Sequence, residues 1–299
     1  MQIELIPHTL DHRVLTEHDF ALVAAHDLER LPPGMTTHQT GLGPLLDSND
    51  QLPRLIELPK VVGRQREILQ RLQTDALEVG GLPPLLVLLR SKASADTVRA
   101  HIGRAQLAQN TAGGQSWLRV HDPRVWVQLT RILTSSQFSS LLGPIESWTL
   151  RFQGAWYRHD RPDVRSTTSR FERHTWLALE RIGVVNRVLA KLEPEVRAFP
   201  ALRARSELID SAIERAMVIH GLRRQEDLVD FGVLAMSVHP AFDQHPEVAT
   251  LLVSRPTSQA KRADPDKQTA MDQLRSQSPS FWQMVKSSLS PPEEAMKEA

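Results

Sequence analysis

The chain of 299 residues contains no cysteine and only one tyrosine. The absence of cysteine excludes disulfides, thiolate metal ligands and cysteine nucleophiles. A long hydrophobic run is also missing: the longest, Leu82 to Leu89, includes two prolines and falls far short of the roughly 20 residues of a membrane helix. Near the N-terminus, Glu4 and Asp11 stand where a signal peptide needs an apolar run. We therefore expect a cytoplasmic protein without stable membrane association.

Lysine is scarce among the 36 basic residues, since it occupies only 7 positions and arginine the other 29. Arginine favours bidentate pairing and protein contacts over simple solvation. Because 35 acidic residues oppose them, the formal net charge is +1, and no long-range field draws in nucleic acid. The 40% hydrophobic and 24% charged content is that of an ordinary globular protein. The length predicts two domains, because single cores stop growing near ~250 to 300 residues.

Motifs of the common enzyme classes are absent: there is no G-x-S-x-G, no G-x-x-x-x-G-K-[ST], no G-x-G-x-x-G and no H-E-x-x-H. His8 and His12 are four residues apart, but Pro7 argues against the helix that would make them metal ligands, so surface histidines are favoured. His121 and Asp122 could hold a catalytic imidazole, yet no nucleophile is identifiable and helix capping accounts for the aspartate. We expect no catalytic residue, no metal and no cofactor.

A strand-like run, a helix start and a helix stop follow one another within residues 115–148. Asp122 is predicted to cap a helix, and Pro123 fits the first helical position, where no N–H is needed. Gly143 can take the left-handed conformation after the last helical turn, and Pro144 prevents continuation. We predict an architectural role for these four residues. The apolar stripe between them comprises Val125, Leu129, Ile132 and Leu133.

Strand-like and helix-like segments alternate in the first half, which predicts a sheet covered by helices, and helical spacing continues from Phe171 onward. The expected fold class is an α/β N-terminal lobe, with a small sheet covered by helices, followed by an all-α C-terminal lobe. The first half has strands expected at 20–25, 85–89 and 115–120, helices at 63–79 and from 94, and one long extended segment at 145–157. The expected domains are 1–157, a linker at 158–170, a helical domain at 171–254, and a flexible tail at 255–299 with a short terminal helix.

The Arg-x-x-Asp-Pro-Arg-Val core at 119–125, followed by Phe-x-x-Leu-x-Gly-Pro-Ile at 138–145 and by Trp148, resembles the N-terminal adaptor domain of type VI secretion effector chaperones. The resemblance extends over about residues 20–148. The run at 216–252 looks like the helical C-terminal extension that many of these chaperones carry.

This resemblance implies a non-catalytic cytoplasmic chaperone that binds one toxin effector, near the N-terminal segment of the effector. The chaperone would load the effector onto the valine-glycine-repeat spike protein or its tip. Tryptophan and arginine are the types most enriched at binding hot spots, and the candidate contact residues are Arg119, Arg124, Trp126, Trp156, Phe281 and Trp282. For each a local role is the favoured alternative: carboxylate pairing for the arginines, core burial for the first two tryptophans, docking on the chain itself for the last two aromatics. The rival functions are an arginine-rich nucleic-acid-binding module, disfavoured by the near-neutral charge, and a general protein-interaction module.

Overall fold

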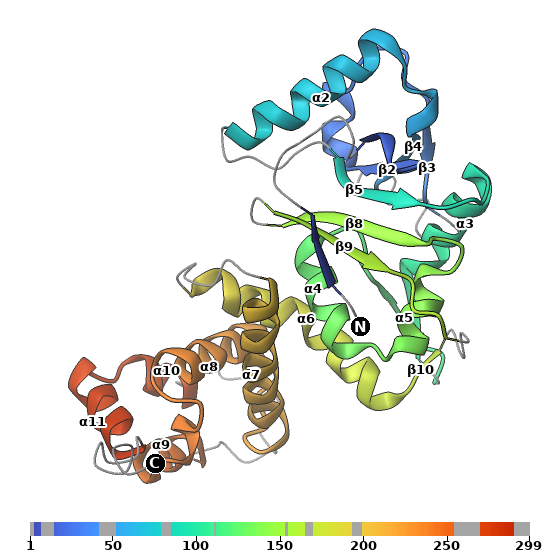
Figure 1. Cartoon of the computed structure of the whole chain (residues 1–299). Helices are drawn as coiled ribbons and strands as arrows, with labels where there is room; N and C mark the ends of the chain where they lie inside the picture. The colour runs from blue at the N-terminus through green and yellow to red at the C-terminus, as the bar shows by residue number, and fades with distance from the viewer. Residues whose placement is uncertain are drawn as a thin grey trace, which may run out of the picture. The chain divides into compact units, whose positions relative to one another are not determined.

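The structure is a computed structural model that describes residues 3–6, 15–41, 52–78, 85–110, 112–152, 155–164, 170–192, 199–253 and 270–289 (Figure 1). The chain divides into two compact units, residues 1–179 and 180–299. The first holds antiparallel strands with helices and the second is helical, so the expected fold class is confirmed.

A seven-stranded sheet of order β1-β9-β8-β5-β2-β4-β3 forms the centre of the first unit. Every pairing in it is antiparallel. The strands are β1 (Ile3–Ile6), β2 (Phe20–Val23), β3 (Thr37–Gln39), β4 (Arg54–Glu57), β5 (Leu85–Arg90), β8 (Ser147–Phe152) and β9 (Ala155–Asp160). The central β5 reads LLVLLR without polar alternation, as expected of a strand covered on both faces.

Helices cover both faces of this sheet (Figure 1). Leu69 of α2 belongs to the same buried cluster as Leu88 of β5. Trp126 of α4 stacks on Trp148 of β8, which pairs with Leu89 of β5. Side chains of successive strand residues point to opposite faces, so α2 and α4 lie on opposite sides of the sheet. The helices of this unit are η1 (Ala25–Arg30), η3 (Leu58–Lys60), α2 (Gly63–Glu78), α3 (Ala95–Ala105), α4 (Pro123–Ile132) and α5 (Ser135–Leu142).

A second sheet of three short strands has the order β10-β6-β7. It comprises β6 (Leu107–Asn110), β7 (Gln115–Trp117) and β10 (Arg170–Phe171), and β10 pairs with β6 in parallel. The expectation that Phe171 opens the first C-terminal helix was therefore wrong, since α6 begins at Arg173. The apolar spacing that suggested a helix at Phe171 arises because its ring is buried beside β6 instead.

Two other sequence predictions each merged elements that the structure separates. They are the extended segment at 145–157 and the helical region between Asp122 and Gly143. Residues 145–157 form no single extended segment, because β8 and β9 pair as a hairpin in which Phe152 lies opposite Ala155. The two residues between these strands lie outside the described residues. The predicted linker at 158–170 overlaps β9, whose last residue is Asp160. Helices α4 and α5 are separate because Thr134 caps α5 in a capping box with Gln137.

The second unit is an assembly of helices around one buried cluster that includes Phe231 and Phe242. Its elements are α6 (Arg173–Lys191, which spans the division between the units), α7 (Phe199–Val218), α8 (Gln225–Ser237), η4 (Phe242–Gln244), α9 (Pro246–Val253), α10 (Ala270–Arg275) and α11 (Pro279–Leu289). The prediction of a flexible tail from 255 was wrong for the stretch that forms α10. Met271 and Leu274 of this helix are fully buried. The sequence around these two apolar residues is polar, so it showed no helical periodicity.

Buried ion pairs join helices of the second unit. Arg181 of α6 and Asp210 of α7 form a bidentate pair, with Nε to Oδ1 at 2.5 Å and Nη2 to Oδ2 at 3.2 Å. Both side chains are 10% exposed. Asp243 accepts hydrogen bonds from Arg215 at 3.0 Å and pairs with His220 at 3.0 Å. These contacts fix the helix axes at defined positions, because a buried charge is tolerated only next to its partner.

Candidate partner-binding surface

Asp122 caps α4 as the sequence predicted, and Pro123 takes the first helical position. The carboxylate accepts the backbone N–H of Arg124 at 2.9 Å. The guanidinium of Arg124 closes on the same carboxylate, with Nε to Oδ1 at 3.1 Å and Nη2 to Oδ2 at 2.8 Å. The side chain of Arg124 is 65% exposed, so the ion pair contributes only ~0 to 1 kcal/mol. The pair nevertheless holds the guanidinium in one orientation on the surface.

Burial on its own raises the pKa of Asp122, but the hydrogen bonds and charge of Arg124 and the charge of Arg119 lower it below its ordinary value. The folded-state pKa then lies below the unfolded one. The resulting stabilisation is therefore present above the unfolded pKa and is lost as the pH falls through the folded pKa.

Asp122→Ala is expected to lower the free energy of unfolding by ~1 kcal/mol at neutral pH, because the first turn of α4 loses its cap. The difference between the two proteins should be smaller in acid, because protonation of the wild-type carboxylate removes part of its stabilising effect. Urea unfolding at neutral and at acidic pH measures both effects. Asp122→Asn keeps a capping acceptor and should retain most of the stability. An unchanged midpoint for the alanine variant would contradict the capping role.

Arg119 lies just beyond β7, and its guanidinium is 5.7 Å from the centroid of the Trp117 ring. A cation–π contact at an exposed site contributes ~0.5 to 1 kcal/mol. Within the described parts of the chain, Arg119 forms no ion pair with a carboxylate. The local carboxylate that sequence reasoning favoured for it is thus replaced by an aromatic ring, and the exposed guanidinium keeps its donors available.

Trp126 and Trp156 are both core residues, with 0% and 2% of their surface exposed. The Trp126 indole stacks on Trp148 at 4.5 Å between centroids and meets Phe138 edge-on at 5.2 Å. Trp156 belongs to the cluster on the other face of the sheet with Leu88. Core burial, the alternative that the sequence favoured, is what the structure shows for both, so neither ring is accessible to a partner in this conformation.

Gly143 and Pro144 end α5 through a β-turn. Gly143 has φ 54° and ψ −114°, and the N–H of Ile145 donates to the carbonyl of Leu142 at 3.0 Å. These angles are those of the first central position of a type II′ turn, which differs from the left-handed helical conformation that the sequence suggested. A Cβ on Gly143 would lie 2.2 Å from Cε1 of His101. Glycine is therefore required here by both the backbone and the neighbouring ring.

Phe281 and Trp282 of α11 are half-buried against the core of the second unit. The two rings meet edge-on at 5.1 Å, and Trp282 also meets Phe242 at 6.2 Å. Docking on the chain itself, the alternative favoured from the sequence, thus accounts for this aromatic pair.

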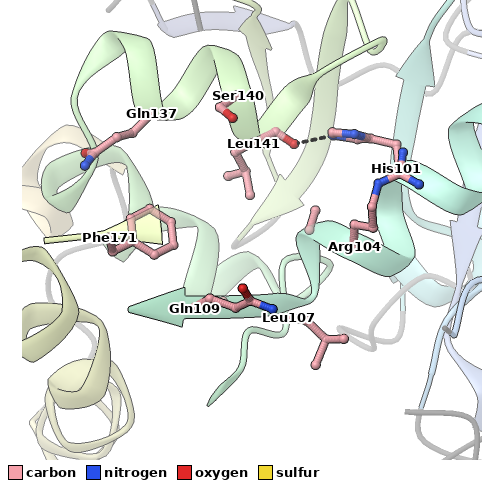
Figure 2. Close-up of a pocket in the computed structure, with 10 residues that line it drawn as sticks. His101, Arg104, Leu107, Gln109, Gln137, Ser140, Leu141 and Phe171 are labelled. Carbon is pink, nitrogen blue, oxygen red and sulfur yellow. Dashed lines mark hydrogen bonds between the residues drawn. The ribbon is translucent and has the colours of Figure 1, made fainter. Parts of the chain in front are cut away.

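A groove that sequence reasoning missed lies in the first unit, between α5 on one side and the α3–β6 corner on the other (Figure 2). Its volume is about 400 Å³. The His101 ring donates from Nε2 to the carbonyl of Leu141 at 2.8 Å and so ties α3 to α5. The lining residues are His101, Arg104, Ala105, Leu107, Ala108, Gln109, Gln137, Ser140, Leu141 and Phe171. No local sequence signal joins residues from α3, β6, α5 and β10, because the groove exists only once these elements have packed.

Of the three histidines weighed as catalytic or metal-binding residues, His121 lies in the part of the chain that the structure describes. His121 is 5% exposed, and burial, together with the charge of Arg119, lowers its pKa to about 4. His8 and His12 lie outside the described residues. Within the described ranges, no group of three or more histidine, aspartate or glutamate side chains could hold a metal ion. Among those same residues, none of the helices is long and apolar enough to cross a membrane.

Comparison with known proteins gives one family. Residues 41–140 match the family model described as a domain of unknown function, DUF4123. No curated protein and no solved structure matches the chain. The matched range runs from the end of β3 to α5 and includes Arg119, Arg124 and most of the groove. Residues 41–140 are therefore similar to the DUF4123 domain, a family known as the type VI secretion effector-associated adaptor domain.

Proposed function

We propose that the protein is a cytoplasmic adaptor that binds one toxin effector of a type VI secretion system, near the N-terminal segment of the effector, and loads it onto the spike protein or its tip. It performs no chemistry. The observation that carries this proposal is the DUF4123 match over residues 41–140. The physical task is to hold a partner and then release it, which suits a moderate interface with polar contacts better than an obligate one.

Arg119 and Arg124 give this interface a candidate contact surface. Both are exposed, and both lie close enough to Asp122 to lower the pKa of that carboxyl. The Trp117 ring supports one guanidinium and the Asp122 carboxylate orients the other. Two positioned guanidinium groups suit carboxylates on a partner, because planar N–H pairs match carboxylate geometry. Trp126 and Trp156 drop out of the contact surface because they are buried.

Joint charge reversal, Arg119→Glu with Arg124→Glu, is expected to weaken effector binding about tenfold or more, because two oriented cations become anions facing the carboxylates of the partner. Calorimetry with the purified effector encoded by a neighbouring gene measures the change. Arg64→Glu, an exposed reversal on α2, is the matched control and should leave the affinity unchanged. Equal affinities for all three proteins would remove the arginines from the interface.

The adaptor function itself is tested by pulldown and by secretion. The folded protein should retain one effector together with the spike protein or its tip. Deletion of its gene should lower delivery of that effector and leave the other effectors in place. If the folded chain retains neither partner, the adaptor proposal fails. Salt-sensitive retention on nucleic acid instead would favour the rival binding module.

A further inference from the structure

We propose that the groove between α5 and the α3–β6 corner is a docking site for a short acidic segment of the effector. The segment places one apolar side chain beside Leu141 and Phe171 and directs a carboxylate to Arg104. This inference rests on the proposed adaptor function and adds to it a second contact, apart from Arg119 and Arg124.

The shape and lining of the groove suit a side chain of a peptide. A volume of about 400 Å³ lies at the lower end of the range of ligand pockets, ~300 to 1,000 Å³. Figure 2 shows Leu141 and Ser140 on the α5 side, Gln109 on the opposite side and the Phe171 ring at one end. The amides of Gln109 and Gln137 and the hydroxyl of Ser140 supply polar groups beside these apolar surfaces. Such a mixture matches a peptide, whose backbone needs hydrogen bonds wherever its side chain is buried.

Charge complementarity selects an acidic occupant. None of the ten residues that line the groove is acidic. Arg104 is exposed, and in the described parts of the chain it forms no ion pair with a carboxylate. The pKa of His101 is lowered by burial, and the charge of Arg104 adds to this effect, so the imidazole is neutral at physiological pH. Arg104 thus supplies the positive charge of the lining, and a partner carboxylate would form its first ion pair there.

The walls of the groove are held in place before any partner arrives. The hydrogen bond from His101 to Leu141 joins α3 to α5. Ser94 caps α3, and the capping box at Thr134 fixes the start of α5. The pairing of β10 with β6 positions Phe171. A preformed site loses little conformational entropy on binding, so even a short segment can gain affinity from it.

Most of the groove lies within the range that matches the family model. Eight of the ten lining residues fall within the DUF4123 match at 41–140, and Leu141 and Phe171 lie beyond it. Phe171 closes one end of the groove and so limits the size of the side chain that fits. Substitution at this position is therefore expected to change which segment is accepted.

Two variants test the groove with the full-length chain and the purified effector of the neighbouring gene. Ser140→Trp fills the groove, and Arg104→Glu reverses its charge; each should weaken effector binding about tenfold. Arg64→Glu on α2 is the matched charge control and should bind as the wild type does. Thermal unfolding of each variant confirms that it is folded, and Arg104→Glu is an exposed substitution that leaves the core intact. Synthetic peptides tiling the N-terminal segment of the effector then identify the bound stretch.

A charge swap separates docking from indirect effects. Replacing the acidic residue of the bound peptide by lysine should abolish binding to the wild-type chain and restore it with Arg104→Glu. If both groove variants bind the effector as the wild type does while the Arg119 and Arg124 reversals do not, the groove proposal is overturned and the adaptor function stands. If the wild-type chain binds no effector, the adaptor proposal fails and the groove proposal falls with it.

A photoreactive p-benzoylphenylalanine in place of Ser140 gives an independent readout in producing cells. A crosslink to the effector is the expected product. Crosslinks within the chain itself, or to a second copy, would overturn the proposal by identifying a different occupant. The same amino acid at Arg64 is the control and should give no effector crosslink.

Discussion

Asp210→Ala is expected to lower the free energy of unfolding of the second unit by ~3 to 5 kcal/mol. The substitution leaves the Arg181 guanidinium, whose side chain is 10% exposed, without its bidentate partner. Two acidic neighbours remain, and both are exposed, so they offset little of the loss: Glu214 is 3.8 Å away and 57% exposed, and Glu180 acts through its charge. The effect is large because the substitution leaves a charge that is already buried without compensation, rather than because the intact pair adds much net stability.

Urea unfolding followed by far-UV circular dichroism measures this change. Glu207→Ala on the same helix is the matched control, since Glu207 is 54% exposed and pairs with Arg203 at 3.4 Å, a contact of ~0.3 to 0.5 kcal/mol. The double variant Arg181→Met with Asp210→Leu should recover much of the stability, because no charge is then buried. Similar losses from Asp210→Ala and Glu207→Ala would show that the Arg181 charge reaches solvent.

Gly143→Ala is expected to destabilise the first unit by ~2 to 4 kcal/mol, since it combines a strained backbone with a collision. The new Cβ would meet the His101 ring at 2.2 Å, and this ring cannot retreat without losing its hydrogen bond to Leu141. We also expect a distorted groove, because the same hydrogen bond joins its two sides. Thermal unfolding measures the first effect, and effector affinity measures the second.

The opposite change in stability is expected for alanine at Gly183, an exposed glycine inside α6, where an added Cβ would meet open space. Gly183→Ala should stabilise the protein by ~0.5 to 1 kcal/mol through helix propensity alone. Stability changes of the same sign at Gly143 and Gly183 would contradict the close approach of His101.

Local signals in the sequence were sufficient to predict an element boundary where the side chain of one residue bonds to an unpaired backbone N–H. Asp122 and Ser94 cap the helices that follow them. The two internal breaks also had signals that were overlooked. Thr134 with Gln137 is a capping box. Gly154 stands between two β-rich runs, where a hairpin turn was to be expected.

Other features depended on contacts between distant residues and could not be predicted from short patterns. Phe171 is a strand residue only because β6, some 60 residues earlier, offers an edge for pairing. Helix α10 is ordered through burial of Met271 and Leu274 and through the ion pairs of Arg275 with Asp227 and Asp230 of α8. The groove likewise requires four elements to meet. Sequence reasoning named Arg119 and Arg124 as candidate contact residues but had no means of placing Arg104 beside an apolar hollow.

The strand order of the large sheet sets the timing of its assembly during synthesis. In that sheet β1 lies at the edge and its neighbour is β9, so that Ile3 pairs with His159. A ribosome adds about 5 to 20 residues per second and makes β1 well before β9, so β1 waits on the order of 10 seconds for its partner. Release of the DUF4123 segment at 41–140 does not end this wait, because β8 and β9 lie beyond it. Nascent chains stalled before residue 160 should therefore leave β1 unpaired and accessible to proteases and to other chains.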